Sequence, residues 1–201
     1  MRFGSGIRHA DYVACTAIEF DGEAPRMDGA IPQMRTFIVP REEVRIDDNW
    51  DVAGLQGTGS CDYHLEDHRV ADHMSFVSST LRPLRGQALY GLPLLSIAAA
   101  PHSGFALGVG RRALDEIAAH AGWRQRLASP TKLAQRGAFQ RDFARARTRL
   151  AAARTLTLDR FRALDEATHA GGPTLSDRAE VSAATTFAYE SALEAAEISF
   201  R

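Results

Sequence analysis

Four polar residues alternate along one predicted strand and could together hold a metal ion. They are Asp62, His64, Glu66 and His68, and His73 follows closely. Because successive side chains of a strand point to opposite faces, the four would share one face. Imidazole and carboxylate groups are ligands that zinc takes. No second predicted strand supplies a matching ligand, so we interpret the row as a solvated strand face and predict no metal site.

A glycine-rich run, Gly57-Thr58-Gly59-Ser60, is a second candidate for chemistry. A dinucleotide-binding loop needs a third glycine and a helix that begins directly after it, and this run has neither. Its glycines instead favour positive φ angles in a loop that borders a ligand. The sequence thus gives no support to a Rossmann site.

Three arginines, Arg141, Arg145 and Arg149, step by four along a predicted helix. Such a stripe could bind nucleic acid, but acidic residues elsewhere balance the total charge. We therefore interpret it as a solvated helix face or an ion-pair surface between subunits and predict no nucleic-acid partner. Serine, histidine and aspartate occur, but none stands in the nucleophile turn of a serine hydrolase.

The composition is that of a globular chain of one domain or two small ones: 201 residues, 45% hydrophobic and 24% charged. Cys15 and Cys61 are too few for a disulfide framework, which fits a reducing cytoplasm. The longest apolar run, residues 92–100, is interrupted by Pro93 and Ser96 and is far shorter than the roughly 20 residues of a membrane span. We predict a soluble cytoplasmic protein without a signal peptide or a membrane partner.

Charge and periodicity change at the same place in the chain. Residues 1–76 carry a net charge of −7, and residues 77–201 carry +6. The first part contains strand-length runs at 11–20, 34–39 and 61–70, separated by turn residues such as Asp21-Gly22 and Asp28-Gly29. After residue 78 alanine, leucine and arginine dominate, which favours helices. The pattern predicts an α+β chain with antiparallel strands first and helices second.

Three helices are expected in the second part. The first covers residues 94–123, perturbed near Pro101. The second follows the capping pair Ser129-Pro130, covers 131–166 and would be about 54 Å long. Gly171-Gly172-Pro173 ends it, and Thr174 to Asp177 has the spacing of a capping box that starts a third helix toward Phe200. The apolar stripe of the second helix, at steps of three and four, is Leu133, Phe139, Phe143, Ala146, Leu150, Ala153, Thr157, Phe161 and Leu164.

Three stretches resemble the acyl-CoA dehydrogenase superfamily. Residues 50–62 match its W-x-x-x-G-L-R-G-T-G-S-x-D segment, with Gln56 in place of the arginine, and Ala71 stands where a proline is usual. Residues 104–120 are similar to the first helix of its C-terminal bundle, and residues 2–12 to its flavin-facing strand. The Gly-Thr-Gly-Ser-x-Asp and Ser-Gly-x-x-His-Ala-Asp motifs resemble the corresponding motifs of the two-component flavin monooxygenases.

This resemblance implies a partial, antiparallel β-barrel-like middle domain at 1–77 and a partial helical bundle at 86–201. Both ends of the chain look like cuts, and the stripes of the second and third helices would be covered by subunits of a homo-oligomer, a tetramer in the family. The implied cofactor is reduced FMN or FAD supplied by a flavin reductase, and the substrate a small aromatic or acyl compound.

The resemblance also implies roles for individual residues. Ser5 would hydrogen-bond flavin N5 and act in catalysis, and Phe3 would pack on the flavin ring. The remaining implied flavin contacts are Gly57, Thr58, Ser60, Arg124, Arg126 and Gln140, with the arginines at the phosphate. Without the resemblance, Ser5 between two glycines is an ordinary turn serine and Phe3 a core strand residue.

The favoured function is a reduced-flavin-dependent monooxygenase component that hydroxylates its substrate. One alternative is an acyl-CoA dehydrogenase that oxidises a CH–CH bond with FAD. Another is a truncated, non-catalytic remnant or assembly bundle. Because the family's remaining pocket walls lie outside these residues, we expect the 201-residue chain alone to bind flavin weakly and to be inactive.

Overall fold

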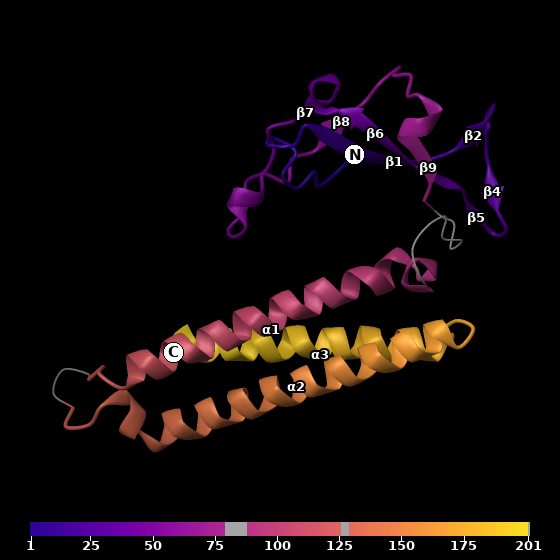
Figure 1. Cartoon of the computed structure of the whole chain (residues 1–201). Helices are drawn as coiled ribbons and strands as arrows, with labels where there is room; N and C mark the ends of the chain where they lie inside the picture. Colours follow the sequence, from indigo (N-terminus) through magenta and orange to yellow (C-terminus); the bar gives the residue numbers. More distant parts are fainter. Residues whose placement is uncertain (79–87, 126–128, 201) are drawn as a thin grey trace. The chain divides into compact units, whose positions relative to one another are not determined.

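The computed structural model describes residues 1–78, 88–125 and 129–200. The chain divides into two compact units, Met1–Thr80 and Leu81–Arg201. The first contains short strands, and the second contains three long helices (Figure 1). Each unit is described by itself. The family fold expected from the sequence, with strands before helices, is confirmed.

The first unit is built on a three-stranded antiparallel sheet in the order β1-β6-β9. The strands are β1 (Tyr12–Ile18), β6 (Met34–Pro40) and β9 (Ser75–Val77). Alternate residues of β1 point inward, so Val13 and Cys15 are buried and pack with Ile7, Val39 and Tyr63. This small core supports the segments that carry the candidate site.

The other strands of this unit form three two-residue ladders. They are β2 (Phe20–Asp21) with β3 (Ala24–Pro25), β4 (Met27–Asp28) with β5 (Ile31–Pro32), and β7 (Arg45–Ile46) with β8 (Tyr63–His64). The 3₁₀ turns are η1 (Arg41–Glu43), η2 (Gln56–Thr58) and η3 (Asp72–Met74). The predicted antiparallel structure is thus confirmed, but within residues 1–78 the sheets stay open and do not close into a barrel.

The strand predicted at 61–70 is wrong beyond β8. Asp67 has a φ of 49°, which an extended strand does not allow. The polar row therefore does not share one strand face. His64 Nε2 lies 2.6 Å from Asp47, and His68 Nε2 lies 2.5 Å from Glu43, so each imidazole pairs with a carboxylate from an earlier segment. In the part of the chain that the structure describes, no three histidine, cysteine or acidic residues are grouped as a metal site would require.

The helical unit consists of α1 (Leu94–Ala121), α2 (Gly137–His169) and α3 (Leu175–Phe200). The turn η4 (Ala88–Gly91) precedes α1, and the turn η5 (Leu133–Gln135) precedes α2. Figure 1 shows α2 running opposite to α1 and α3. The hydrogen bonds agree with this direction. The Ser103 hydroxyl donates to Thr185 Oγ1, and the Ser199 hydroxyl donates to the Ala113 carbonyl, so α3 is parallel to α1. The predicted apolar stripe of α2 is confirmed, with buried residues Ala146, Leu150, Ala153, Thr157 and Leu164.

The glycines of α1 do not share one role. A Cβ on Gly110 would lie 2.9 Å from the Cα of Ala192 in α3 and 3.0 Å from a methyl group of Leu150 in α2. Gly110 therefore permits the close approach of three helices. A Cβ on Gly104 or Gly108 would meet no atom within 4 Å, so these two glycines are not needed for helix packing within the described part of the chain. The helix also continues without a break through Pro101.

The predicted start of α2 is wrong by six residues. Gln125 and Lys132 form an antiparallel bridge, and the N–H of Leu133 donates to the Arg124 carbonyl. These bonds join residues seven and nine positions apart and hold residues 131–136 outside the helix, although Ser129-Pro130 is a helix-start pattern. α2 ends at His169, three residues later than predicted, and the predicted stop follows it, since Gly171 and Gly172 have φ values of 119° and 111°.

The start of α3 is also as predicted. The Asp177 N–H donates to Thr174 Oγ1 at 3.2 Å, and the Thr174 N–H donates to Asp177 Oδ2 at 2.8 Å. These reciprocal bonds form the capping box that the spacing indicated. No helix among the described residues is long and apolar enough to cross a membrane.

Candidate functional site

Two distant segments of the first unit meet and bring predicted flavin-binding residues together. The N–H of Gly4 donates to the Cys61 carbonyl at 2.9 Å, and the N–H of Gly6 donates to the Thr58 carbonyl at 2.8 Å. Phe3 and Ser5 consequently lie beside the loop of Gly57, Thr58 and Ser60. Five of the eight predicted residues therefore belong to one local cluster of the strand unit.

A chain of hydroxyl groups runs through this cluster. Ser5 Oγ lies 2.8 Å from Ser60 Oγ, which lies 2.8 Å from Thr58 Oγ1. Thr58 Oγ1 then donates to the Leu55 carbonyl at 2.9 Å. Ser60 is buried, whereas Ser5 is exposed at the outer end. The arrangement presents a single oriented hydroxyl to the surface.

The loop that holds Thr58 contains an uncommon backbone. Leu55 and Gly59 flank the turn η2 with φ values of 59° and 51°, both left-handed. The Trp50 Nε1–H donates to the same Leu55 carbonyl at 3.1 Å and helps fix the loop. The predicted positive φ is thus found at Gly59, while Gly57 does not have it. Leu55 was not foreseen, because a leucine gives no local signal for this conformation.

Phe3 is an exposed aromatic side chain at this surface. It is 68% exposed, and its ring meets Trp50 edge to face with a centroid distance of 6.4 Å. The interpretation of Phe3 as a core strand residue is therefore wrong. A free ring face beside the Ser5 hydroxyl suits a flat heterocyclic ligand with a polar edge.

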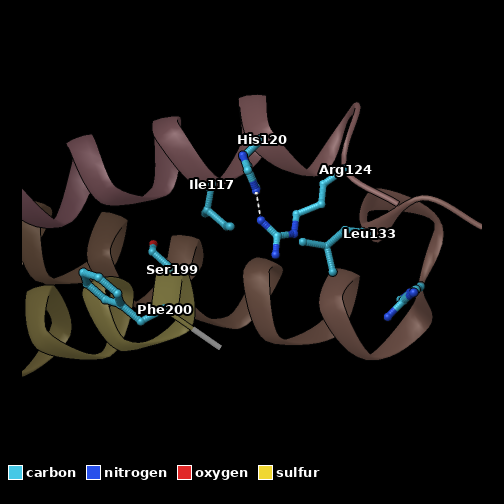
Figure 2. Close-up of a pocket in the computed structure, with 7 residues that line it drawn as sticks. Ile117, His120, Arg124, Leu133, Ser199 and Phe200 are labelled. Carbon is cyan, nitrogen blue, oxygen red and sulfur yellow. Dashed lines mark hydrogen bonds between the residues drawn. The ribbon is translucent and has the colours of Figure 1, made fainter. Parts of the chain in front are cut away.

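The helical unit has a separate pocket at the end of α1 (Figure 2). Its volume is about 180 Å³, and its lining consists of Ile117, His120, Arg124, Leu133, Arg136, Ser199 and Phe200. Figure 2 shows the Arg124 guanidinium turned toward His120, with 2.9 Å between Nη1 and Nε2. Because arginine only donates, His120 Nε2 is the acceptor in this contact. Two guanidinium groups at one small pocket suit an anion such as a phosphate.

The three residues predicted at the flavin phosphate differ in their placement. Arg124 lines the pocket, Arg126 lies outside the described residues, and exposed Gln140 donates to the Ala134 carbonyl at 2.9 Å without lining the pocket. His120 and Arg136 line the pocket but were missed. The spacing of four between His120 and Arg124 is the helical signal that could have identified the histidine.

The other polar candidates have partners within the chain or are buried. Arg145 pairs with Glu194 at 3.3 Å, and Arg149 pairs with Glu194 at 3.2 Å, so these stripe arginines connect α2 to α3. Arg141 pairs with its neighbour Asp142. The cysteines are buried and free, and burial raises the pKa of the Cys15 thiol, which weakens it as a nucleophile.

Comparisons with known proteins agree with this fold. The family model described as "Acyl-CoA dehydrogenase, C-terminal domain" matches residues 100–201. An indole-3-acetate monooxygenase of Pseudomonas putida is 33% identical over 172 residues, which are 86% of this chain and 42% of that protein. The flavin-dependent monooxygenase oxygenase subunit HsaA of Rhodococcus jostii is 32% identical over 133 residues, which are 63% of this chain and 33% of that protein.

A solved structure has the same fold. XiaF from Streptomyces sp., in complex with FADH2 and glycerol, superposes with a TM-score of 0.77 over 96% of this chain and 50% of its own, at 21% identity. The chain spans less than half the length of the curated relatives described above. The family model matches residues 100–201, which are just over half of the chain, and the chain therefore belongs to the acyl-CoA dehydrogenase family.

Proposed function

We propose that the protein containing this chain is the oxygenase component of a two-component flavin-dependent monooxygenase and hydroxylates a small aromatic substrate. The observation that carries the proposal is the exposed Phe3 ring beside the outward hydroxyl of Ser5, held by the loop of Thr58 and Ser60. The names of the relatives, an indole-3-acetate monooxygenase and an oxygenase subunit, support this reaction class.

The residues of the strand unit fit the ring system of a reduced FMN or FAD. Phe3 would pack on the isoalloxazine, Ser5 would hydrogen-bond N5, and Gly57, Thr58 and Ser60 would border the ring. The fit rests on chemistry: a free aromatic face and a single exposed hydroxyl match a flat ring with one polar edge. When bound, the reduced flavin supplies two electrons to O2, so that one oxygen atom enters the substrate and the other leaves as water.

The residues of the helical unit fit a phosphate. Arg124 would hold it together with Arg136, and His120 keeps the Arg124 guanidinium in place. The pocket of about 180 Å³ is smaller than a typical ligand site, which suits one group of a ligand better than a whole flavin. Arg126 and Gln140 remain proposed contacts, and Gln140 would first have to leave the Ala134 carbonyl.

The same proposal includes partners. A flavin reductase would supply the reduced flavin, as the description "oxygenase subunit" of one relative suggests. The protein would be a homo-oligomer, a tetramer as the resemblance implies, and would act in the cytoplasm. A groove of about 380 Å³ between α1 and α2, lined by Leu107, Leu114 and Phe143 among others, leaves apolar surface for such an assembly.

The family match favours one second function, the oxidation of an acyl-CoA by FAD. The two reactions differ in their use of oxygen, because a dehydrogenase passes electrons to an acceptor and adds no oxygen atom. A remnant that serves only in assembly would bind no flavin at all.

The deciding experiment uses the complete gene product with a flavin reductase, NADH and FMN or FAD under ¹⁸O2. Indole-3-acetate and simple phenols are the test substrates. Incorporation of one ¹⁸O atom into a product supports the proposal. Oxidation of an acyl-CoA under anaerobic conditions with a ferrocenium acceptor would instead establish the dehydrogenase. A protein that binds neither FMN nor FAD in either redox state would contradict both enzymes.

A further inference from the structure

We infer that Thr58 and Ser60 fix the direction of the Ser5 hydroxyl and thereby make the site select reduced over oxidised flavin. This inference rests on the proposed function, since it takes Ser5 to face flavin N5. It assigns Thr58 and Ser60 as positioning residues that act through Ser5.

The direction follows from counting protons, beginning at the Leu55 carbonyl. A carbonyl oxygen only accepts, so the 2.9 Å contact between Thr58 Oγ1 and Leu55 O requires the Thr58 proton between them. Without that proton, two lone pairs would face each other. This contact is also the shortest of the three hydrogen bonds that the Leu55 carbonyl accepts, the others being 3.1 Å from Trp50 Nε1 and 3.1 Å from the Thr58 N–H.

The remaining protons are then determined. Thr58 has no second proton, so the 2.8 Å contact with Ser60 must contain the Ser60 proton. Ser60 likewise has none left for its 2.8 Å contact with Ser5, which must contain the Ser5 proton. Ser60 is only 6% exposed, so its hydroxyl depends on these two partners and not on water. All three hydroxyls therefore donate inward, toward Leu55.

The outer face of Ser5 consequently offers lone pairs and no proton. A ligand atom there must be a donor, such as an N–H or an O–H. Flavin N5 carries a hydrogen when reduced and only a lone pair when oxidised. Ser5 therefore accepts a hydrogen bond from the reduced form, whereas in the oxidised form its lone pair would face the lone pair of N5. One such hydrogen bond corresponds to a preference of about three- to tenfold.

Variants of the chain of hydroxyls should change this preference. In Thr58→Val the inner acceptor is lost, so either Ser5 or Ser60 can donate to the other and Ser5 can turn its proton outward. In Ser60→Ala the Ser5 hydroxyl has no fixed partner and rotates freely. Both variants should therefore bind oxidised flavin relatively better. Thr58→Ser keeps the hydroxyl and should retain the preference.

The test measures dissociation constants of the complete gene product for oxidised FMN and for anaerobically photoreduced FMN, and repeats both with FAD. Thr58→Val and Ser60→Ala should lower the ratio of oxidised to reduced dissociation constants by about three- to tenfold. Thr58→Ser should keep it within about twofold. Spectroelectrochemistry gives a second readout, because a tenfold lower ratio lowers the two-electron midpoint potential of the bound flavin by about 30 mV.

The outcomes separate this inference from the proposed function. A wild-type protein that hydroxylates and binds flavin, but whose ratio is unchanged in both Thr58→Val and Ser60→Ala, overturns the inference alone. A wild-type protein that binds neither form of flavin overturns the proposed function and this inference with it. If Thr58→Val does not fold, as judged by circular dichroism, Ser60→Ala decides the question on the same ratio.

Discussion

The hydroxyl oxygens of Ser5 and Ser60 lie 2.8 Å apart although 55 positions separate the two residues in the sequence. The antiparallel bridge between Gly4 and Cys61 produces this contact. A Cβ on Gly4 would lie 3.0 Å from the Tyr63 ring and 3.2 Å from the Cys61 carbonyl, so the absence of a side chain lets the segments approach. The hydroxyl pair is therefore a product of close backbone packing.

Ser5→Ala in the complete protein should increase the hydrogen peroxide released per NADH consumed by a factor of several. The reason is that the variant loses the hydroxyl proposed to contact flavin N5, and oxygen reduction then proceeds without transfer to the substrate. Peroxide is measured with a peroxidase-coupled dye while product is quantified in parallel. Ser176→Ala on the exposed start of α3 is the control and should not change the yield. An unchanged peroxide yield in Ser5→Ala would remove Ser5 from the mechanism.

Arg124→Gln should weaken the binding of FMN by about tenfold and leave the binding of riboflavin nearly unchanged. Riboflavin lacks the phosphate that Arg124 is proposed to hold, so it is a matched ligand. Isothermal titration of the complete protein measures both affinities. Arg162→Gln replaces an exposed arginine of α2 that lines neither this pocket nor the groove between α1 and α2, and it should leave both affinities unchanged. An equal loss for FMN and riboflavin would show that Arg124 does not bind the phosphate.

Gly110→Ala should destabilise the helical unit by about 1–3 kcal/mol, because the new methyl group overlaps Ala192 and Leu150. Gly108→Ala is the matched control two positions away. It faces open space in the same helix and should stabilise the unit by up to about 1 kcal/mol, because alanine favours the helix. Urea unfolding followed by circular dichroism measures both. Equal effects of the two substitutions would contradict the close packing at Gly110.

The capping box of α3 should make the stability depend on pH in acid. Hydrogen bonds from the Thr174 hydroxyl and N–H lower the pKa of Asp177 below its ordinary value. A lowered pKa in the folded state gives a stabilisation that is complete above the unfolded pKa of about 3.9 and is lost as the pH falls through the folded pKa.

Thr174→Ala tests this dependence. The substitution should return the pKa of Asp177 toward its ordinary value and should lower Tm at pH 7 more than at pH 2. NMR titration of the Asp177 carboxyl and thermal melts at the two pH values measure the effects. Ser176→Ala, which removes a neighbouring hydroxyl outside the capping box, is the control. A pKa of Asp177 that stays unchanged in Thr174→Ala would refute the capping bond as its cause.

The helical unit should associate in solution, because large apolar side chains remain on its surface. Leu193 is 61% exposed and Leu175 is 76% exposed on α3. Light scattering of the complete protein should give the mass of a homo-oligomer, and Leu193→Glu should reduce that mass or make it depend on concentration. A wild-type monomer at micromolar concentration would contradict the proposed assembly.

The helices and the strands near 11–20 and 34–39 could be predicted from local signals, but the course of the chain after Cys61 and the site could not. Gly171 and Thr174 mark their helix ends by their own conformations and side chains, so the sequence was sufficient there. The polar row after Cys61 alternates like a strand, yet its histidines pair with Asp47 and Glu43 from an earlier segment. The start of α2 was missed because Gln125 and Lys132 pair across a short loop, and the helix-start pattern Ser129-Pro130 does not reveal that pairing.

Some residues of the candidate site could be identified from local spacing, and others could not. Ser5, Thr58 and Ser60 were named through the family resemblance, because no periodicity relates residues so far apart. The order of the hydroxyls and the exposure of Phe3 follow from three-dimensional contacts alone. His120 is the residue that helical spacing would have revealed, since it stands one turn before Arg124.

Two of the three described non-glycine residues with a positive φ, Phe3 and Leu55, stand at the candidate site. A left-handed backbone costs such residues about 1–2 kcal/mol each, and the surrounding hydrogen bonds must offset that cost. The segments of the candidate site should therefore unfold more easily than the sheet that supports them. Local opening of residues 3–6 and 55–60, well before the sheet itself unfolds, would therefore determine how long the site remains competent at elevated temperature.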